Sequence, residues 1–200
     1  MKKISVIVAG LALASSQVSA LDIQYFIGAG AEYSKAKVEG SGDGESDNFN
    51  SKDTAFKVKT GVILDKTHRI SLSYSKPSDN TNFTDEDDDG NEVSATMKSE
   101  VTAILLNYDY FFPITTDFRL GVGAHLGSAK LELKGEGEKF SDRGIAYGAQ
   151  LSAIYDITKN VEFEVGYGHT RYNVDINYDD DWKDELKYTN SAYAGVNFKF

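Results

Sequence analysis

The sequence predicts an all-β protein, an eight-stranded antiparallel up-and-down β-barrel that spans a membrane. Three observations predict it. Apolar residues alternate with polar or small ones along most of the chain, short turn signals recur at nearly even intervals, and long acidic segments lie between them. Alternation with a period of two is typical of strands, because successive side chains point to opposite faces of a sheet.

The first twenty residues are typical of a secretory signal peptide. Lys2 and Lys3 precede an apolar run over 4–14, and small residues end at Ala20. This run is shorter than the roughly 20 residues that a membrane helix needs. We therefore predict a signal peptide over 1–20, cleaved after Ala20, and one barrel domain over 21–200. The sequence has no cysteine, so no disulfide framework is expected.

The remaining chain divides into four similar units. Turn signals lie at 65–68, 113–117 and 156–160. Each interval between them fits two strands joined by a longer polar loop. The expected strands are 22–36, 54–64, 69–76, 97–111, 117–130, 143–156, 161–172 and 186–200, and the expected loops are 39–53, 77–95, 132–142 and 173–185. Short turns at one end and long loops at the other are typical of outer-membrane barrels, so we expect periplasmic turns and termini and extracellular loops.

The alternation also predicts which face is inside. One parity of the expected strands, from Ile23 to Phe200, holds 38 apolar residues, 14 of them aromatic. The interior of an eight-stranded barrel is only wide enough for side chains to fill, so this row must face lipid. The other parity combines many glycines with charges of both signs, which can pair inside the barrel. The predicted internal charge network is Glu32, Lys57, Lys59, Arg69, Asp109, Arg119, Glu162, Glu164 and Lys199.

The chain ends on an alternating apolar row, Ala192, Ala194, Val196, Phe198 and Phe200. Closure requires the last strand to pair with the first, which explains why this end is not polar. With the signal peptide and the strand pattern, the ending resembles the small eight-stranded outer-membrane barrels of the OmpA/OmpX and opacity-protein type. This resemblance implies that Phe198 and Phe200 form the signal recognised by the barrel assembly machinery in a Gram-negative bacterium.

The resemblance also implies a location in the cell outer membrane, with outer-membrane lipid and lipopolysaccharide as partners. Its members include adhesins and structural proteins, so we expect a non-enzymatic, porin-like surface barrel. The acidic loops, with aromatic residues such as Trp182, would serve adhesion, interaction or envelope structure. The acidic balance excludes nucleic acid as a partner, and a monomer is expected. A narrow pore for ions or small solutes is the alternative, although eight strands leave little room for water.

Two further chemistries are partly matched by the sequence. Asp85, Asp87 and Asp89 follow the start of a calcium-loop pattern, but Thr96 stands where that pattern needs glutamate, so a solvated acidic loop is favoured. Barrel enzymes that hydrolyse lipid A place a histidine and a serine on one strand face. His125 and Ser128 are three residues apart and therefore face opposite ways. No catalytic residue and no cofactor is expected, and lipid A hydrolysis or acyl transfer is the remaining enzymatic alternative.

Overall fold

The computed structural model describes residues 22–42, 45–86, 92–134, 139–179 and 182–200. The predicted signal peptide and its cleavage site at Ala20 lie outside these residues. Within them, no helix is long and apolar enough to cross a membrane. The described residues form nine strands: β1 (Ile23–Gly42), β2 (Glu45–Leu64), β3 (His68–Ser75), β4 (Ser78–Glu86), β5 (Glu92–Pro113), β6 (Phe118–Lys134), β7 (Lys139–Asp156), β8 (Val161–Asp179) and β9 (Trp182–Lys199).

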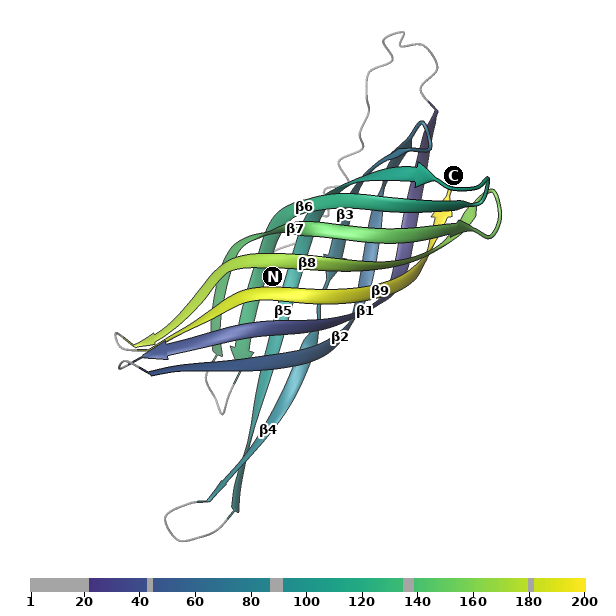
Figure 1. Ribbon diagram of the computed structural model, residues 1–200. Helices are drawn as coiled ribbons and strands as arrows, with labels where there is room; N and C mark the ends of the chain where they lie inside the picture. Colours follow the sequence, from purple (N-terminus) through teal and green to yellow (C-terminus); the bar gives the residue numbers. More distant parts are fainter. Residues whose placement is uncertain (1–21, 43–44, 87–91, 135–138, 180–181) are drawn as a thin grey trace, which may run out of the picture.

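These strands form a closed antiparallel barrel of eight positions (Figure 1). Neighbours in the chain pair with one another, and β1 closes the barrel by pairing with β9 over 17 residue pairs. β3 and β4 pair with successive parts of β5 and so share one position. Pro77 separates them because it has no backbone N–H for the ladder, although its carbonyl accepts a hydrogen bond from Val101 N at 3.1 Å. The prediction of an eight-stranded barrel is confirmed.

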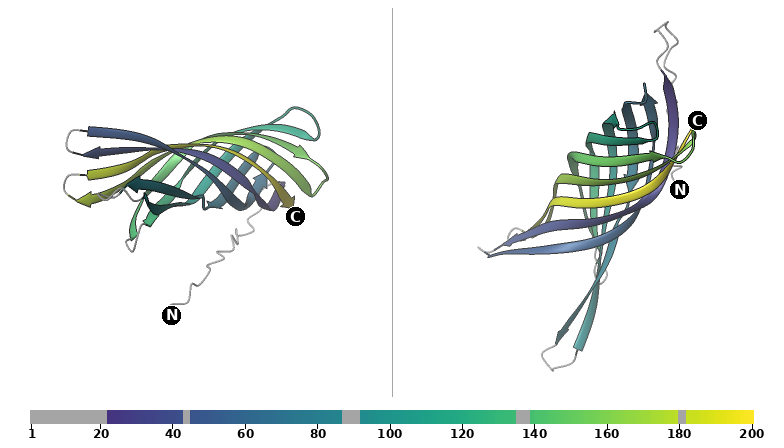
Figure 2. Two further views of the ribbon diagram at one scale, coloured as in Figure 1. Left: turned by 90° about the horizontal axis from the view of Figure 1, so that it is seen from below. Right: turned by 45° about the vertical axis from the view of Figure 1, so that its right-hand side comes forward.

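The strands are longer than the alternation predicts. The segments 39–53, 77–95, 132–142 and 173–185, expected as loops, are for the most part paired strand. Their sequences are mostly polar at successive positions, so they carry no two-residue pattern by which a strand could be recognised. Hydrogen bonding to the neighbouring strand, rather than the local sequence pattern, makes these segments strands. Figures 1 and 2 show the β1–β2 and β4–β5 hairpins extending well beyond the barrel at the end opposite the C terminus.

The three short turns lie where the sequence places them, at the end of the barrel that carries Phe200. In the first turn, Thr67 N donates to Leu64 O, and the two central residues, Asp65 and Lys66, have φ values of 49° and 60°. Two left-handed central residues define the hairpin turn whose twist matches that of the flanking strands. Aspartate tolerates this conformation better than most residues, which explains its place here.

The apolar row points outward, as the sequence predicts. Leu126, Leu151 and Ile27 are 59%, 60% and 58% exposed, and the exposed apolar side chains cover every strand of the barrel wall. Aromatic side chains border this surface at both ends. Tyr25, Tyr110, Tyr155 and Phe200 lie near the short turns, and Tyr33, Tyr74, Tyr147 and Tyr167 lie toward the hairpins. Two aromatic bands around an apolar wall are typical of a barrel embedded in lipid.

The inner face contains apolar layers as well as ions. Phe26, Ile63, Phe111 and Ile154 are completely buried near the short turns. A second group is buried toward the hairpins and comprises Ala103, Leu105, Ala129, Leu131, Ala146 and Val174. The sequence predicts glycines and charges in the interior but not these layers, because single inward apolar residues do not disturb a pattern of alternation.

A charge on the outer wall tests this arrangement. Leu151 lies on β7 midway between Tyr147 and Tyr155, so Leu151→Arg is expected to lower the free energy of unfolding in a lipid bilayer by about 2–4 kcal/mol. The measurement is equilibrium urea unfolding in vesicles. The matched control is Ile157→Arg, because Ile157 is similarly exposed, at 55%, but lies in a short turn beyond the aromatic residues. Its effect should stay below about 1 kcal/mol, and equal effects would contradict the membrane placement.

Candidate functional site

The lumen near the short turns is filled by a network of ionised side chains. Seven of the predicted network residues meet here: Lys59, Arg69, Asp109, Arg119, Glu162, Glu164 and Lys199. They come from β2, β3, β5, β6, β8 and β9, so the network joins strands on opposite sides of the barrel. Each occupies an inward position of its strand, between outward residues that face lipid.

Arg69 is at the centre of this network and is 1% exposed. Its Nη1 and Nη2 donate to the two carboxylate oxygens of Glu164 at 2.8 and 3.0 Å, and its Nε donates to Asp109 Oδ2 at 2.9 Å. A guanidinium has a planar fork of donors that matches a carboxylate in this two-point manner. Arg69 therefore connects β3 to β5 and also, across the lumen, to β8.

Neutral side chains complete the hydrogen bonding of these carboxylates. Asn197 Nδ2 donates to Glu162 Oε1 at 2.8 Å and to Glu164 Oε2 at 2.9 Å, and Gln150 donates to Asp109. Buried charges are costly unless their remaining lone pairs are also satisfied. The sequence does not predict that these amides join the network, since an inward asparagine or glutamine carries no signal beyond its parity.

A second cluster of ions lies beside the first, at the short turns. Arg119 Nη2 donates to Glu162 Oε2 at 2.7 Å and to Asp156 Oδ1 at 3.0 Å, and Lys199 also bonds to Asp156. Asp156 was not predicted because it ends a strand and was read as part of a turn. With it, four cations and four carboxylates share this part of the lumen.

Aromatic rings cover the guanidinium groups. The Cζ atom of Arg69 lies 4.8 Å from the ring centre of Phe111 and 5.7 Å from that of Phe26. Arg119 Cζ lies 5.2 Å from the ring centre of Phe111. Contacts of this kind stabilise a cation by its attraction to the ring face and exclude water from it. The ring of Phe111 therefore contacts both guanidinium groups.

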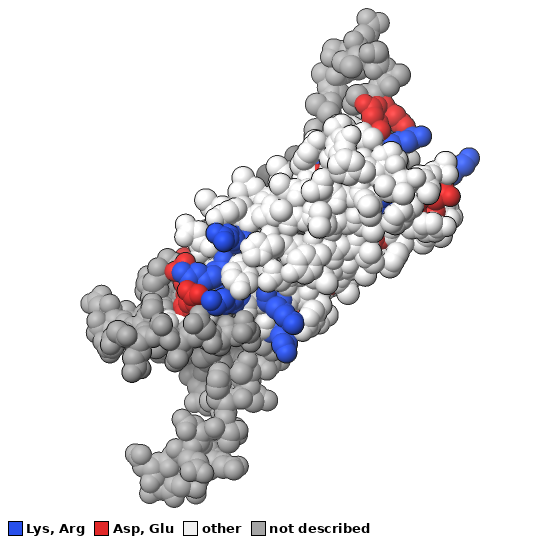
Figure 3. Space-filling view, viewed as in Figure 1, with Lys and Arg blue, Asp and Glu red and all other residues white. Residues whose placement is uncertain are grey.

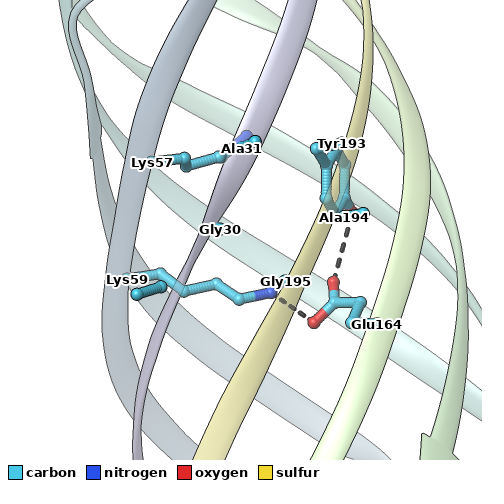
Figure 4. Close-up of a pocket in the computed structure, with 9 residues that line it drawn as sticks. Gly30, Ala31, Lys57, Lys59, Glu164, Tyr193, Ala194 and Gly195 are labelled. Atoms are coloured by element: carbon cyan, nitrogen blue, oxygen red, sulfur yellow. Dashed lines mark hydrogen bonds and ion pairs between the residues drawn. The ribbon is translucent and has the colours of Figure 1, made fainter.

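The two remaining predicted residues form a separate ion pair. Lys57 Nζ donates to Glu32 Oε2 at 2.6 Å, and it lies 4.6 Å from the ring centre of Tyr193. Tyr193 in turn donates to Glu164 Oε1 at 3.2 Å, which connects this pair to the main network. Figure 4 shows Lys59 and Tyr193 approaching the same carboxylate from different strands.

Glycines give the network its room. A Cβ atom at Gly123 would collide with Asp109 Oδ1, and one at Gly28 would collide with Asn197 Oδ1. Both glycines lie on the inner face directly against a member of the network. At these two positions the inward glycines leave space for other side chains.

Little free space remains in the described part of the lumen. Two cavities, one lined by Lys59 and Glu164 and the other by His125 and Thr170, each offer about 20 Å³, room for about one water molecule. The ions in this part of the lumen are therefore bonded to one another rather than to free water.

The candidate enzymatic residues are not brought together. His125 is buried and its Nε2 lies 2.9 Å from Thr170 Oγ1, whereas Ser128 is exposed on the outer face. Among the described residues, no group of three or more histidines, aspartates or glutamates could hold a metal ion. Of the metal candidates, Asp87 and Asp89 lie outside the described residues, and for Asp85 the structure describes only the backbone, in β4.

The predicted assembly signal lies at the closing seam. Phe200 and Tyr25 exchange backbone hydrogen bonds of 2.9 and 3.1 Å. The rings of Phe198 and Tyr25 each lie 6.3 Å from that of Phe200, centre to centre, and both phenylalanines are exposed on the outer wall. Their recognition by an assembly machinery remains a prediction.

A family model described as outer membrane protein beta-barrel domain matches residues 6–200. The chain therefore belongs to this family of Gram-negative outer-membrane barrels, and its location is the outer membrane. No curated protein sequence shows significant similarity to the chain.

Several solved structures share the fold. Neisserial surface protein A has a TM-score of 0.60 at 17% identity, covering 88% of this chain and 97% of its own. OprG from Pseudomonas aeruginosa has a TM-score of 0.57 at 12% identity, covering 88% and 95%. Ail, the attachment invasion locus protein of Yersinia pestis, has a TM-score of 0.53 at 15% identity, covering 89% and 99%. At these identities the likeness concerns the fold alone.

The network predicts a large penalty for losing its central cation. Arg69→Met leaves Asp109 and Glu164 short of a buried partner and should lower the free energy of unfolding by about 3–5 kcal/mol. Arg69→Lys should recover part of this loss, because lysine keeps the charge but not the two-point contact. Urea unfolding followed by the gel shift between folded and boiled protein provides the measurement.

Lys130→Met is the matched control, since Lys130 pairs with Glu132 on the outer face and is far more exposed. Its effect should stay below about 1 kcal/mol. If Arg69→Met were no more destabilising than this control, the network would not hold the strands together.

Proposed function

We propose that this protein is a closed, non-conducting outer-membrane scaffold that displays its hairpins outside the cell for adhesion or interaction. The observation that carries the proposal is a lumen filled by mutually bonded ions beneath hairpins that extend far beyond the membrane. A barrel closed in this way has no path for solutes, so its outward extensions are the part available for function.

The length of the strands supports this interpretation. A tilted strand crosses a bilayer in about 9–11 residues, whereas β1 and β2 each have 20 residues. On β1, the outward apolar row ends at Tyr33, and the strand continues to Gly42. At about 3.3 Å per residue, this extension is roughly 30 Å long, measured along the strand. A protein that needed only a membrane anchor would not require it.

The hairpins are also the acidic part of the protein. Most of its aspartates and glutamates lie in 39–53, 77–95, 132–142 and 173–185, where lysine and arginine are few. Such a surface favours a partner with positive charge, or one bridged by divalent cations. Ail, in contrast, has been solved with the heparin analogue sucrose octasulfate, which is a negatively charged ligand. We therefore expect different ligand chemistry here despite the shared fold.

Orientation is part of the proposal. Both ends of the described chain, Asp22 and Phe200, lie with the short turns (Figure 1). A chain exported with a signal peptide and inserted from the periplasm would keep its ends on that side, which directs the hairpins outward. Protease cleavage of intact cells at a site inserted after Gly42, with protection of one inserted after Thr116, would support this orientation. The reverse pattern would refute it.

The absence of conduction can be measured directly. The refolded protein should give no steady conductance steps in planar bilayers, because eight strands with a filled lumen leave no continuous water path. Glu164→Ser combined with Arg69→Ser should open small conductances by removing the centre of the network. Regular steps from the unmodified protein would instead support the pore alternative.

The interaction role is tested by shortening the hairpins. Replacing 38–49 and 80–95 by two-residue turns should leave a barrel that folds, because the ion network and twelve of the 17 β1–β9 residue pairs lie elsewhere. Binding of intact bacteria to polylysine-coated surfaces and to host cells should then fall at least tenfold. A matched variant keeps the hairpin lengths and changes their acids to asparagine and glutamine. Full binding by the shortened barrel would overturn the proposal.

A further inference from the structure

Basic side chains gather on the outer wall where the barrel passes into its hairpins. Lys35 and Lys37 on β1, Lys52 on β2, Arg171 on β8 and Lys187 on β9 all lie on this outer surface, which we call the basic arc. Figure 3 shows Lys and Arg side chains at this end of the molecule, beside the uncharged wall. The protein as a whole is strongly acidic, so a cluster of basic residues on the outer surface of its barrel is unexpected.

The arc lies immediately beyond the lipid-facing wall. On β1 the outward residues run through Ile27 and Tyr33 to Lys35, and on β8 they run through Val165 and Tyr167 to Arg171. The strands are paired side by side across this region: Lys35 lies opposite Lys52, and Tyr188 lies opposite both Lys37 and Arg171. The basic residues therefore follow the aromatic band around part of the circumference.

Two members of the arc already have acidic partners. Lys37 Nζ donates to Glu39 at 2.7 Å, and Lys187 lies 2.7 Å from Glu185 and 3.6 Å from Glu39. These hydrogen bonds raise the pKa of Lys37 and of Lys187 and lower that of Glu39, so all three groups are charged at neutral pH. This part of the arc is close to electrically neutral.

The other three members carry uncompensated charge. Among the described residues, no ion pair is formed by Lys35, Lys52 or Arg171, and all three are exposed. Lys35 and Lys52 are directly opposite each other across β1 and β2. Like charges in this position destabilise a sheet. An anion bound between them would remove the repulsion and gain two charge-assisted hydrogen bonds.

We propose that the basic arc binds the phosphate groups of lipid A, the membrane anchor of lipopolysaccharide. Lipid phosphates lie just outside the hydrocarbon, which is the depth at which the arc follows the aromatic band. The arc faces the surrounding lipid rather than the lumen or the hairpin tips, so its ligand has to come from the membrane. Placing the arc in the outer leaflet rests on the orientation proposed above.

The test uses the full-length mature protein refolded in detergent and titrated with bisphosphorylated lipid A in EDTA, with binding followed by native mass spectrometry. Each basic residue near a charged lipid surface contributes about a fivefold change in affinity. Lys35→Gln/Lys52→Gln should therefore weaken binding by more than tenfold, and addition of Arg171→Gln should weaken it further. The EDTA excludes bridging by divalent cations through the acidic hairpins.

The matched control is Lys66→Gln/Lys159→Gln, which removes two exposed lysines from the short turns. This variant should bind lipid A as the unmodified protein does. The gel shift on boiling verifies that each variant is folded.

Three outcomes would overturn the proposal. The first is equal binding by the arc and control variants, and the second is equal binding of lipid A and its dephosphorylated form. The third is displacement of lipid A by millimolar inorganic phosphate, which would assign the arc to a soluble anion. None of these measurements involves the hairpin tips or the orientation in cells, so failure here and failure of the adhesion role can be told apart.

Discussion

The need to pair every backbone N–H and C=O inside hydrocarbon determines the architecture of this protein. An open sheet would leave two unpaired edges in lipid, so the first and last strands must meet, and the paired Tyr25 and Phe200 are where they do. One residue beside β5, a proline, has no N–H to pair. Pro77 interrupts the ladder beside β5, but only after the outward apolar row of β3 has ended at Tyr74.

Closure then dictates the character of the interior. Filling the lumen with apolar residues would be at least as stabilising as filling it with ions, since buried ion pairs gain little over packed apolar groups. Strands apolar on both faces, however, would have no preferred side, and a register slip of one residue would exchange lipid-facing and lumen-facing side chains. Arg69, Glu164 and their partners make such an exchange prohibitive, because it would place the charged side chains of the slipped strand in lipid and leave their partners unpaired in the lumen. We infer that the network specifies the orientation of each strand more than it adds stability.

The sequence predicts well whatever depends on a two-residue period. The eight positions, the short turns, the lipid-facing row and the inward side of the charged residues all follow from parity. The sequence cannot predict which inward residues meet, because that depends on strand tilt and stagger. Asp156 and Asn197 both bond to the network, and nothing in the sequence indicates it. Nor does the sequence find the ends of β1 and β2, since Ser, Asn and Asp on both faces give no alternation. Nor is the layer of Phe26 and Phe111 evident from the sequence, because a single inward apolar residue leaves the alternation of its strand intact.

Basic and acidic side chains lie at different heights along the barrel axis. This separation links the binding of lipid A by the basic arc to the display of the acidic hairpins. Acidic hairpins above a membrane whose lipids carry phosphate would be repelled by it, and the repulsion would act over about 10 Å at ordinary ionic strength. Lys35, Lys52 and Arg171 lie between the apolar wall and those hairpins, where positive charge reduces the repulsion most effectively. A bound phosphate neutralises the arc and leaves the hairpins as the charged surface beyond the membrane. The like-charged Lys35 and Lys52, unfavourable in the isolated sheet, are then explained by the environment in which the sheet is used.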